Sequence, residues 1–169
     1  MRNKHLIFGL GILLLSLANL PSAQAQKAGI GLRLGGHTGG ISGKYFFRDA
    51  LAVEALLGTG WGRRGLQLTG LVEIHASAFD VEGLRWFYGG GTHVGFFKGR
   101  YYHKPSNRHY AESYNRNLTT VGIDGIVGLE YQITEIPVSL GIDFKPFIET
   151  NRDGLFLYGD GALTVRYTF

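Results

Sequence analysis

The stretch ALTVRYTF, residues 162–169 at the C-terminal end, alternates strictly between two kinds of residue. Leu163, Val165, Tyr167 and Phe169 are apolar or aromatic, and the residues between them are small or polar. A period of two is typical of a β-strand whose two faces meet different surroundings. The stretch therefore predicts a strand that ends on an aromatic residue.

The same alternation recurs along the chain from residue 27 onward. Ile30, Leu32 and Leu34 form one face near the start, and Val121, Ile123 and Val127 form one face in the middle. No convincing run of apolar residues at helical spacing is present after residue 26. We predict eight strands, at 27–35, 40–47, 51–61, 66–76, 85–97, 118–131, 136–145 and 156–169.

The connectors between these strands predict an up-and-down meander. Closing an antiparallel meander into a barrel removes both exposed edges. The second, fourth and sixth connectors, at 48–49, 77–84 and 132–135, are short. The fifth (98–117) and the seventh (146–155) are the two longest, so long connectors gather at one end. Short turns at one end and long loops at the other are typical of outer-membrane barrels.

Length and composition exclude several classes of protein. The 169 residues predict one domain, or two small ones at most. With 44% hydrophobic and 18% charged residues, the composition is too apolar for a disordered chain. The 27 glycines show no Gly-X-Y period and stand beside only 4 prolines, which excludes a collagen-like chain. Because the chain has no cysteine, a disulfide scaffold, a thiolate metal site and a cysteine nucleophile are excluded.

The N-terminal segment has the three parts of a secretory signal peptide. Arg2, Lys4 and His5 precede an apolar run over 6–17, and Ala23-Gln24-Ala25 supplies a cleavage site. We expect residues 1–25 to be removed and residues 26–169 to form the barrel domain. Cleavage leaves 15 of the 17 basic residues against 13 acidic ones, a net charge of +2. This small charge and the export signal argue against a nucleic-acid partner.

The polar face of the strands is predicted to line the inside of the barrel. Glycine is frequent on this face, where small residues leave room in a narrow eight-stranded barrel for a few large polar ones. The charged residues there nearly balance, five bases against six acids, as a closed interior with little water requires. We expect a charge network within the lumen made of Arg33, Lys44, Glu54, Glu73, Arg85, Asp124, Glu130, Asp143, Lys145, Asp160 and Arg166.

Aromatic residues gather at the predicted strand ends in two bands. The band at the long-loop end is expected to contain Trp61, Phe96, Phe97, Phe144, Phe147 and Phe156. The band at the short-turn end is expected to contain Phe47, Trp86, Tyr131, Tyr167 and Phe169. Two aromatic girdles are expected where rings lie at the two interfaces of a bilayer. The predicted fold is therefore an all-β, closed, eight-stranded, antiparallel up-and-down transmembrane β-barrel.

Over residues 27–169 the chain resembles the small eight-stranded outer-membrane β-barrels of Gram-negative bacteria, in the style of the OmpA and OmpX barrels. The resemblance is most specific at the C-terminus, where Leu163, Val165, Tyr167 and Phe169 are similar to the signal read by the outer-membrane assembly machinery. It implies a monomer in the outer membrane, with both termini in the periplasm and the long loops outside the cell.

The connector 98–117 is the most distinctive polar segment. Lys98, Arg100, Lys104, Arg108 and Arg116 are its bases, against the single acid Glu112. In an extracellular loop these bases would lie close to lipopolysaccharide phosphates, with which Arg and Lys make charge-assisted hydrogen bonds. The expected partners are thus outer-membrane lipid and lipopolysaccharide, while a solvated, variable loop is an equally weighted interpretation.

No catalytic or metal site is expected. Ser106, Ser113, His103, His109 and Glu112 supply suitable residue types, but one loop imposes no geometry on them. We therefore predict a non-enzymatic protein without cofactor or metal, and a lipid-modifying enzyme is the minor alternative.

Three roles remain open for such a barrel. A structural or surface-interaction protein is the first, and a narrow or gated pore for ions or small solutes is the second. The third is a secreted, soluble, lipocalin-like barrel, which would have an apolar interior and a polar exterior.

Overall fold

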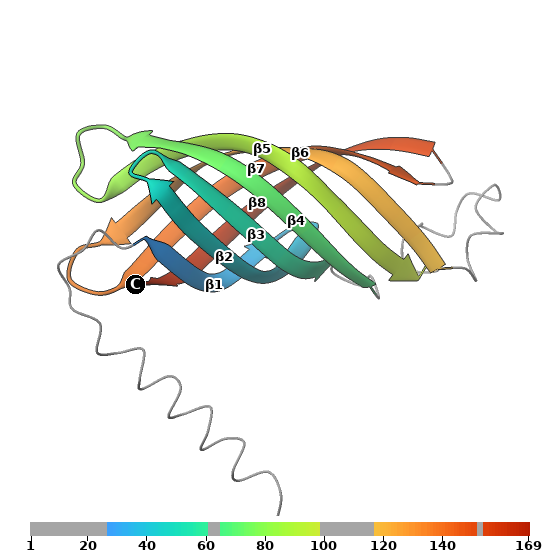
Figure 1. The fold of residues 1–169 in the computed structure, drawn as a ribbon, viewed down its shortest axis with the longest axis horizontal. Helices are drawn as coiled ribbons and strands as arrows, with labels where there is room; N and C mark the ends of the chain where they lie inside the picture. Colours follow the sequence, from blue (N-terminus) through green and yellow to red (C-terminus); the bar gives the residue numbers. More distant parts are fainter. Residues whose placement is uncertain (1–26, 61–64, 99–116, 152–153) are drawn as a thin grey trace, which may run out of the picture.

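The computed structural model describes residues 27–60, 65–98, 117–151 and 154–169 (Figure 1). Within them the chain forms eight strands in a single sheet. The strands are β1 (Ala28–Gly35), β2 (Thr38–Arg48), β3 (Leu51–Gly60), β4 (Gly65–Ser77), β5 (Leu84–Lys98), β6 (Asn117–Ile133), β7 (Val138–Asn151) and β8 (Gly154–Thr168). Among the described residues, no helix is long and apolar enough to cross a membrane.

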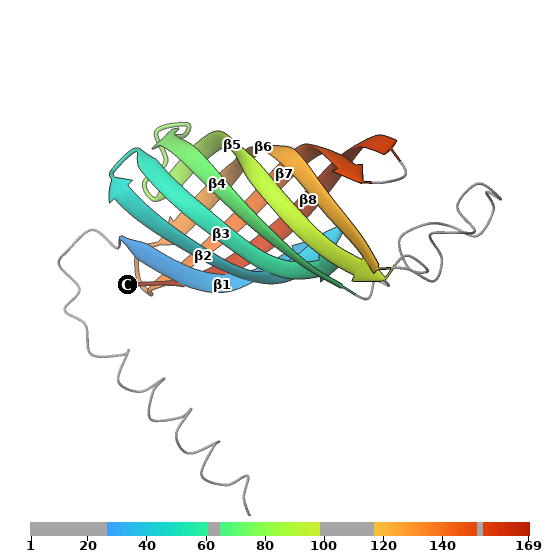
Figure 2. The ribbon, with the colours of Figure 1, turned by 45° about the vertical axis from the view of Figure 1, so that its right-hand side comes forward.

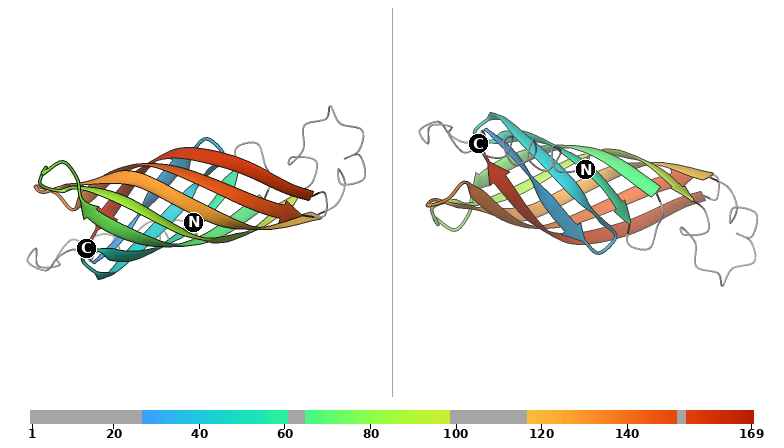
Figure 3. Two further views of the ribbon diagram at one scale, coloured as in Figure 1. Left: turned by 90° about the horizontal axis from the view of Figure 1, so that it is seen from above. Right: turned by 90° about the horizontal axis from the view of Figure 1, so that it is seen from below.

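The sheet closes on itself, which confirms the predicted closed, eight-stranded, antiparallel barrel. Each strand pairs antiparallel with the next, and β8 pairs with β1 through register pairs that run from Gly29–Thr168 to Gly35–Ala162. Figure 2 and Figure 3 show the strands crossing the barrel at a tilt, as closure requires. The C-terminus lies at the same end as the β4–β5 turn, which we call the short-turn end (Figure 1).

The β7–β8 hairpin differs from the sequence prediction. We expected a long connector from residue 146 to 155, but β7 continues to Asn151 and β8 begins at Gly154. Pro146 lies inside β7, next to Gly125 of β6. The β6–β7 pairing is interrupted there, so Pro146 has no paired residue on β6. A proline is tolerated where no ladder hydrogen bond is needed from it. Only the fifth connector is therefore long, so the expected difference between the two ends rests on that segment.

Glycine on the inner face is required by close approach of neighbouring strands. A Cβ atom on Gly91 would overlap the carbonyl oxygen of Gly70 on β4, and one on Gly40 would overlap that of Leu57 on β3. The outward-facing Gly43 and Gly70 have open space at the same position. Gly91 and Gly40 on the inner face are therefore needed for steric reasons that do not apply to Gly43 and Gly70.

Candidate functional site: the charged interior and the apolar exterior

The structure places the predicted lumen residues on inward-facing positions of the strands. All of them are buried except Arg85, which is half-buried at the short-turn end. Within the strands, every charged side chain that the structure describes lies on this inward face except Arg48 at the end of β2. The interior is thus the polar side of the protein.

Lys44 on β2 is the centre of a network in the half of the interior near the short-turn end, which we call the lower network. Its Nζ lies 2.7 Å from Glu73 Oε2, 3.0 Å from Glu130 Oε2 and 3.7 Å from Glu54 Oε2. His75 on β4 adds a contact of 3.0 Å between its Nε2 and Glu73 Oε2. One buried ammonium therefore joins carboxylates from β3, β4 and β6.

Arg166 on β8 completes the lower network. Its guanidinium pairs with Glu54 and, at 3.2 Å, with Glu130 Oε1, while its Nε donates to Ser42 Oγ at 2.7 Å. Ser139 Oγ donates to Glu130 Oε1 at 2.8 Å. These bonds tie β8 to β2, β3 and β6 across the lumen, which is the arrangement expected of a rigid polar plug.

A layer of apolar side chains lies next to the lower network. Leu56, Leu71, Phe87 and Ile126 form one buried cluster contributed by β3, β4, β5 and β6. The Lys44 ammonium lies 4.4 Å from the centroid of the Phe87 ring, a cation–π contact. Among the described residues, no hydrogen bond or ion pair found in the structure joins the lower network to the charged groups beyond this layer.

Beyond the layer, Arg33 on β1 holds two carboxylates. Its Nη2 lies 2.6 Å from Asp143 Oδ1, and its Nη1 lies 2.9 Å from Asp160 Oδ2. Thr38 Oγ1 and the His37 backbone amide also donate to Asp160, each at 2.7 Å. Arg33 thereby links β1 with β7 and β8 at the strands where the barrel closes.

His93 on β5 lies between two carboxylates in the same half of the interior. Its Nδ1 is 2.7 Å from Asp124 Oδ2, and its Nε2 is 3.5 Å from Glu149 Oε2. Lys145 Nζ contacts the second oxygen of Asp124 at 2.5 Å. A neutral imidazole donates from one nitrogen only, whereas an imidazolium donates from both. Among the described residues, only the Nδ1 contact is a hydrogen bond, because Nε2 has no hydrogen-bond partner.

Glu149 is an interior residue that the sequence analysis missed. We placed the end of its strand at residue 145 because of Pro146, although the alternation Lys145, Phe147, Glu149 continues beyond it. With Glu149 included, and with Arg85 half-buried, the fully buried interior holds seven carboxylates against Arg33, Lys44, Lys145 and Arg166. The expected near-balance is therefore wrong for the buried interior, where His75 and His93 also contact carboxylates.

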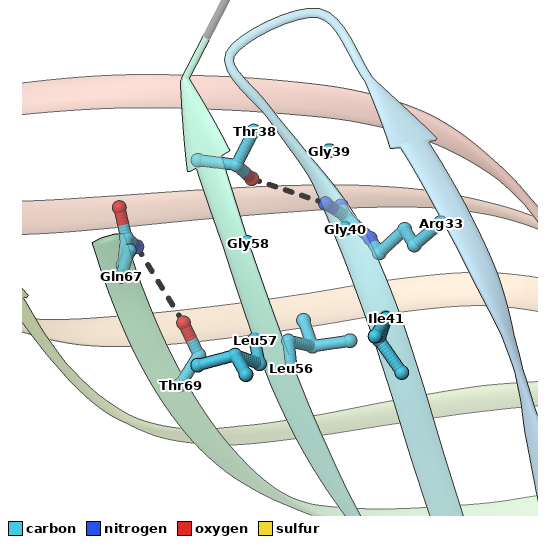
Figure 4. Close-up of a pocket in the computed structure, with 10 residues that line it drawn as sticks. All are labelled: Arg33, Thr38, Gly39, Gly40, Ile41, Leu56, Leu57, Gly58, Gln67 and Thr69. Atoms are coloured by element: carbon cyan, nitrogen blue, oxygen red, sulfur yellow. Dashed lines mark hydrogen bonds between the residues drawn. The ribbon is translucent and has the colours of Figure 1, made fainter. Parts of the chain in front are cut away.

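A small cavity lies between β1, β2, β3 and β4, in the same half as Arg33 (Figure 4). Its volume is about 20 Å³, which is room for a single water molecule. Figure 4 shows Arg33 donating to Thr38, and Gln67 donating to Thr69, at its edge. The cavity is too small for an organic ligand.

The outer surface of the barrel carries the apolar face of every strand. The exposed side chains include Leu32 at 59% exposure together with Ile30, Leu68, Val72, Ile123, Ile142, Leu157, Leu163 and Val165. The expected aromatic band at the short-turn end is present, since Phe47, Trp86, Tyr131 and Phe169 are exposed there. Tyr45 and Tyr88 extend this band by packing on Phe47 and Trp86.

The expected aromatic band at the long-loop end is largely wrong. Phe97 and Phe147 point inward, each with 3% exposure, and Phe144 lies near the middle of β7. Of the expected set, Phe96 is an exposed ring near that end, and Trp61 lies outside the described residues. Phe147 instead packs with Tyr158 and His37 at this end of the lumen. Parity along the strand, not position near its end, decides which way a ring points.

Several predicted residues lie outside what the structure describes. They include the signal peptide over 1–25 and the loop residues Arg100, Lys104, Arg108 and Arg116. Lys98 is the last residue of β5, but its side chain is not described. Leu163, Val165, Tyr167 and Phe169 occupy outward positions at the end of β8 and just beyond it. In the described part of the chain, no group of three or more His, Asp or Glu residues is arranged to hold a metal ion.

No protein-family model and no curated protein matches this chain. Among solved structures, it is similar to a chain from the de novo design of transmembrane beta-barrels. The identity is 14%, the match covers 86% of this chain and 98% of that chain, and the TM-score is 0.48. The function of this chain is therefore inferred from its own residues.

Proposed function

We propose that this protein is an integral outer-membrane β-barrel of a Gram-negative bacterium with a structural or surface-interaction role. The observation that carries the proposal is the distribution of charge across the barrel wall. The charged side chains that the structure describes within the strands point inward except Arg48 at the end of β2, and large apolar side chains cover the outside. A bilayer favours this distribution, because a charged side chain at its centre is costly and an apolar one is not.

Closure of the sheet supports the same proposal. In hydrocarbon every backbone N–H and C=O group needs a hydrogen-bond partner within the protein. In a closed barrel each strand has a neighbouring strand on both sides, which supplies these partners. A soluble lipocalin-like barrel would instead need a polar exterior and an apolar interior. The observed burial of Arg33, Lys44, Asp124 and Arg166 is the opposite arrangement.

The filled interior favours a structural role over transport. A pore needs a continuous path of water-wide polar space. Here the cluster of Leu56, Leu71, Phe87 and Ile126 fills the side of the lumen formed by β3, β4, β5 and β6, and Phe147 packs with Tyr158. Insertion of the protein into a planar bilayer should therefore give no ion current above that of the protein-free membrane. Steady single-channel currents would favour the narrow or gated pore instead.

The proposed route and partners follow from segments at the two ends of the chain and from the fifth connector. Residues 1–25 would direct export, and Leu163, Val165, Tyr167 and Phe169 would be read by the assembly machinery. The bases Lys98, Arg100, Lys104, Arg108 and Arg116 would contact lipopolysaccharide phosphates. Replacement of all five by glutamine should lower the affinity for lipopolysaccharide vesicles, and unchanged affinity would reject this contact.

The protein is proposed to act as a monomer without enzymatic activity or cofactor.

Fractionation followed by heat-modifiability on a denaturing gel tests the proposal. We expect the protein in the outer-membrane fraction, with a band whose mobility changes between unheated and boiled samples. A water-soluble periplasmic band without such a change would overturn it.

A further inference from the structure

The barrel opens at its short-turn end into a vestibule of 870 Å³. Its walls come from β1, β2, β4, β5, β6 and β8 and from the turn between β4 and β5. Lys44, Arg166 and Glu130 of the lower network line it, and Arg85 and Phe46 also face it. The volume lies in the range of small-molecule sites, which is about 300–1,000 Å³. The proposed structural role does not use this space.

Three bases line this vestibule, and two of them are already neutralised. Lys44 and Arg166 pair with Glu54, Glu73 and Glu130 of the lower network, which leaves Arg85 as the remaining base. Glu130 is already engaged, because Lys44 and Arg166 donate to it at 3.0 and 3.2 Å. Glu82 is exposed in the β4–β5 turn, where solvent screens its charge. An anion would therefore be attracted by Arg85 and not by the whole set of bases.

Arg85 is the cation of the vestibule that is available to a ligand. It is paired in register with Ser77 on β4 and Glu130 on β6, yet its side chain forms no ion pair or hydrogen bond with any described residue. Its guanidinium carbon lies 5.7 Å from the centroid of the Phe46 ring. A half-buried guanidinium held near an aromatic ring still presents N–H groups that match a carboxylate.

The remaining wall of the vestibule is mixed. It includes the apolar side chains Phe46, Val81, Leu84 and Ile133 together with the polar Ser77, Gln132, Thr134 and Thr168. An inorganic ion would leave the apolar side chains in contact with water, whereas an anion with a short hydrocarbon chain would cover them. We propose that the short-turn vestibule binds an amphipathic organic carboxylate, with Arg85 holding the carboxylate and Phe46 and Leu84 contacting its chain. This site goes beyond the proposed function and exists whether or not the barrel spans a membrane.

The test uses the folded barrel in nanodiscs of zwitterionic lipid, with hexanoate as the probe and hexanamide as its uncharged counterpart. Backbone amide shifts are followed by NMR during titration. We expect saturable shifts for Phe46, Arg85 and Glu130 with hexanoate, with a dissociation constant at or below about 1 mM. Hexanamide should bind at least about tenfold more weakly. Equal binding of the two compounds, or no saturable shift with hexanoate, would overturn the proposal.

Two arginine variants separate this site from general attraction of anions to the barrel end. Arg85→Gln should weaken hexanoate binding by about tenfold or more. Arg48→Gln removes an exposed arginine from the end of β2, outside the vestibule, and should leave binding unchanged. Equal losses in both variants, or no loss in Arg85→Gln, would contradict the role of Arg85. Retention of the folded gel mobility establishes that each variant is intact before titration.

Discussion

Lys145 Nζ and Asp124 Oδ1 lie 2.5 Å apart, with both side chains fully shielded from solvent. Asp124 also contacts His93, and Lys145 also lies 4.5 Å from the centroid of the Phe147 ring. The pair thus joins β6 to β7 at the point where Pro146 leaves a gap in the ladder between them. A charge left alone in such a place is costly, because little water reaches it.

Removal of Lys145 should destabilise the barrel strongly. Lys145→Met leaves Asp124 buried beside one histidine, and we expect the free energy of unfolding to fall by about 3–5 kcal/mol. Urea unfolding in lipid vesicles measures this change. Lys27→Met, at an exposed position before β1, is the control and should change stability by less than about 0.5 kcal/mol. Adding Asp124→Asn to Lys145→Met should recover part of the loss, and failure to recover any would argue against an unpaired charge as the cause.

A charge on the outside should distinguish a membrane barrel from a soluble one. Leu32 is exposed near the middle of β1, so Leu32→Arg should cost about 2–4 kcal/mol in a bilayer. Phe47→Arg, at the short-turn end, should cost about 0–1 kcal/mol for the charge, in addition to the lost ring contacts with Tyr45. Unfolding in vesicles provides both values. A neutral effect of Leu32→Arg would mean that water, not lipid, covers this face.

Two glycines on adjacent strands should differ sharply in tolerance. Gly91→Ala forces a methyl group against the backbone of β4 and should cost about 1–3 kcal/mol. Gly70→Ala places its methyl group in open space on the outer face and should change stability by less than about 0.5 kcal/mol. Denaturant unfolding of the two variants makes the comparison. Equal costs would indicate that glycine here serves flexibility and not close strand packing.

The terminal aromatic residue should matter more for assembly than for the finished barrel. The backbone of Phe169 exchanges hydrogen bonds with Ala28, and its ring is exposed. Phe169→Ala keeps the backbone bonds, so the purified, refolded protein should remain stable to within about 1 kcal/mol. In cells, however, the amount in the outer membrane should fall several-fold. Quantitative immunoblotting of membrane fractions measures this, and an undiminished amount would remove Phe169 from the assembly signal.

Alternation was the part of the fold that could be predicted residue by residue. Which side chains point inward follows from the pleat of the strand, so Arg33, Lys44 and Asp124 were placed correctly from local sequence. The end of β7 could not be predicted in this way. Pro146 is a local signal for a loop, but its tolerance depends on a missing ladder pair with β6, more than twenty residues away.

The sequence by itself determined the eight strands and the polarity of their two faces. These properties are local, because the period of two does not depend on distant residues. Only the tertiary structure decided the partners: Arg166 meets Glu54 at a separation of 112 residues, and Arg33 meets Asp160 at 127. Those pairs are set by the stagger of the strands in the closed sheet, which also leaves Arg85 in the vestibule without an ion-pair partner among the described residues.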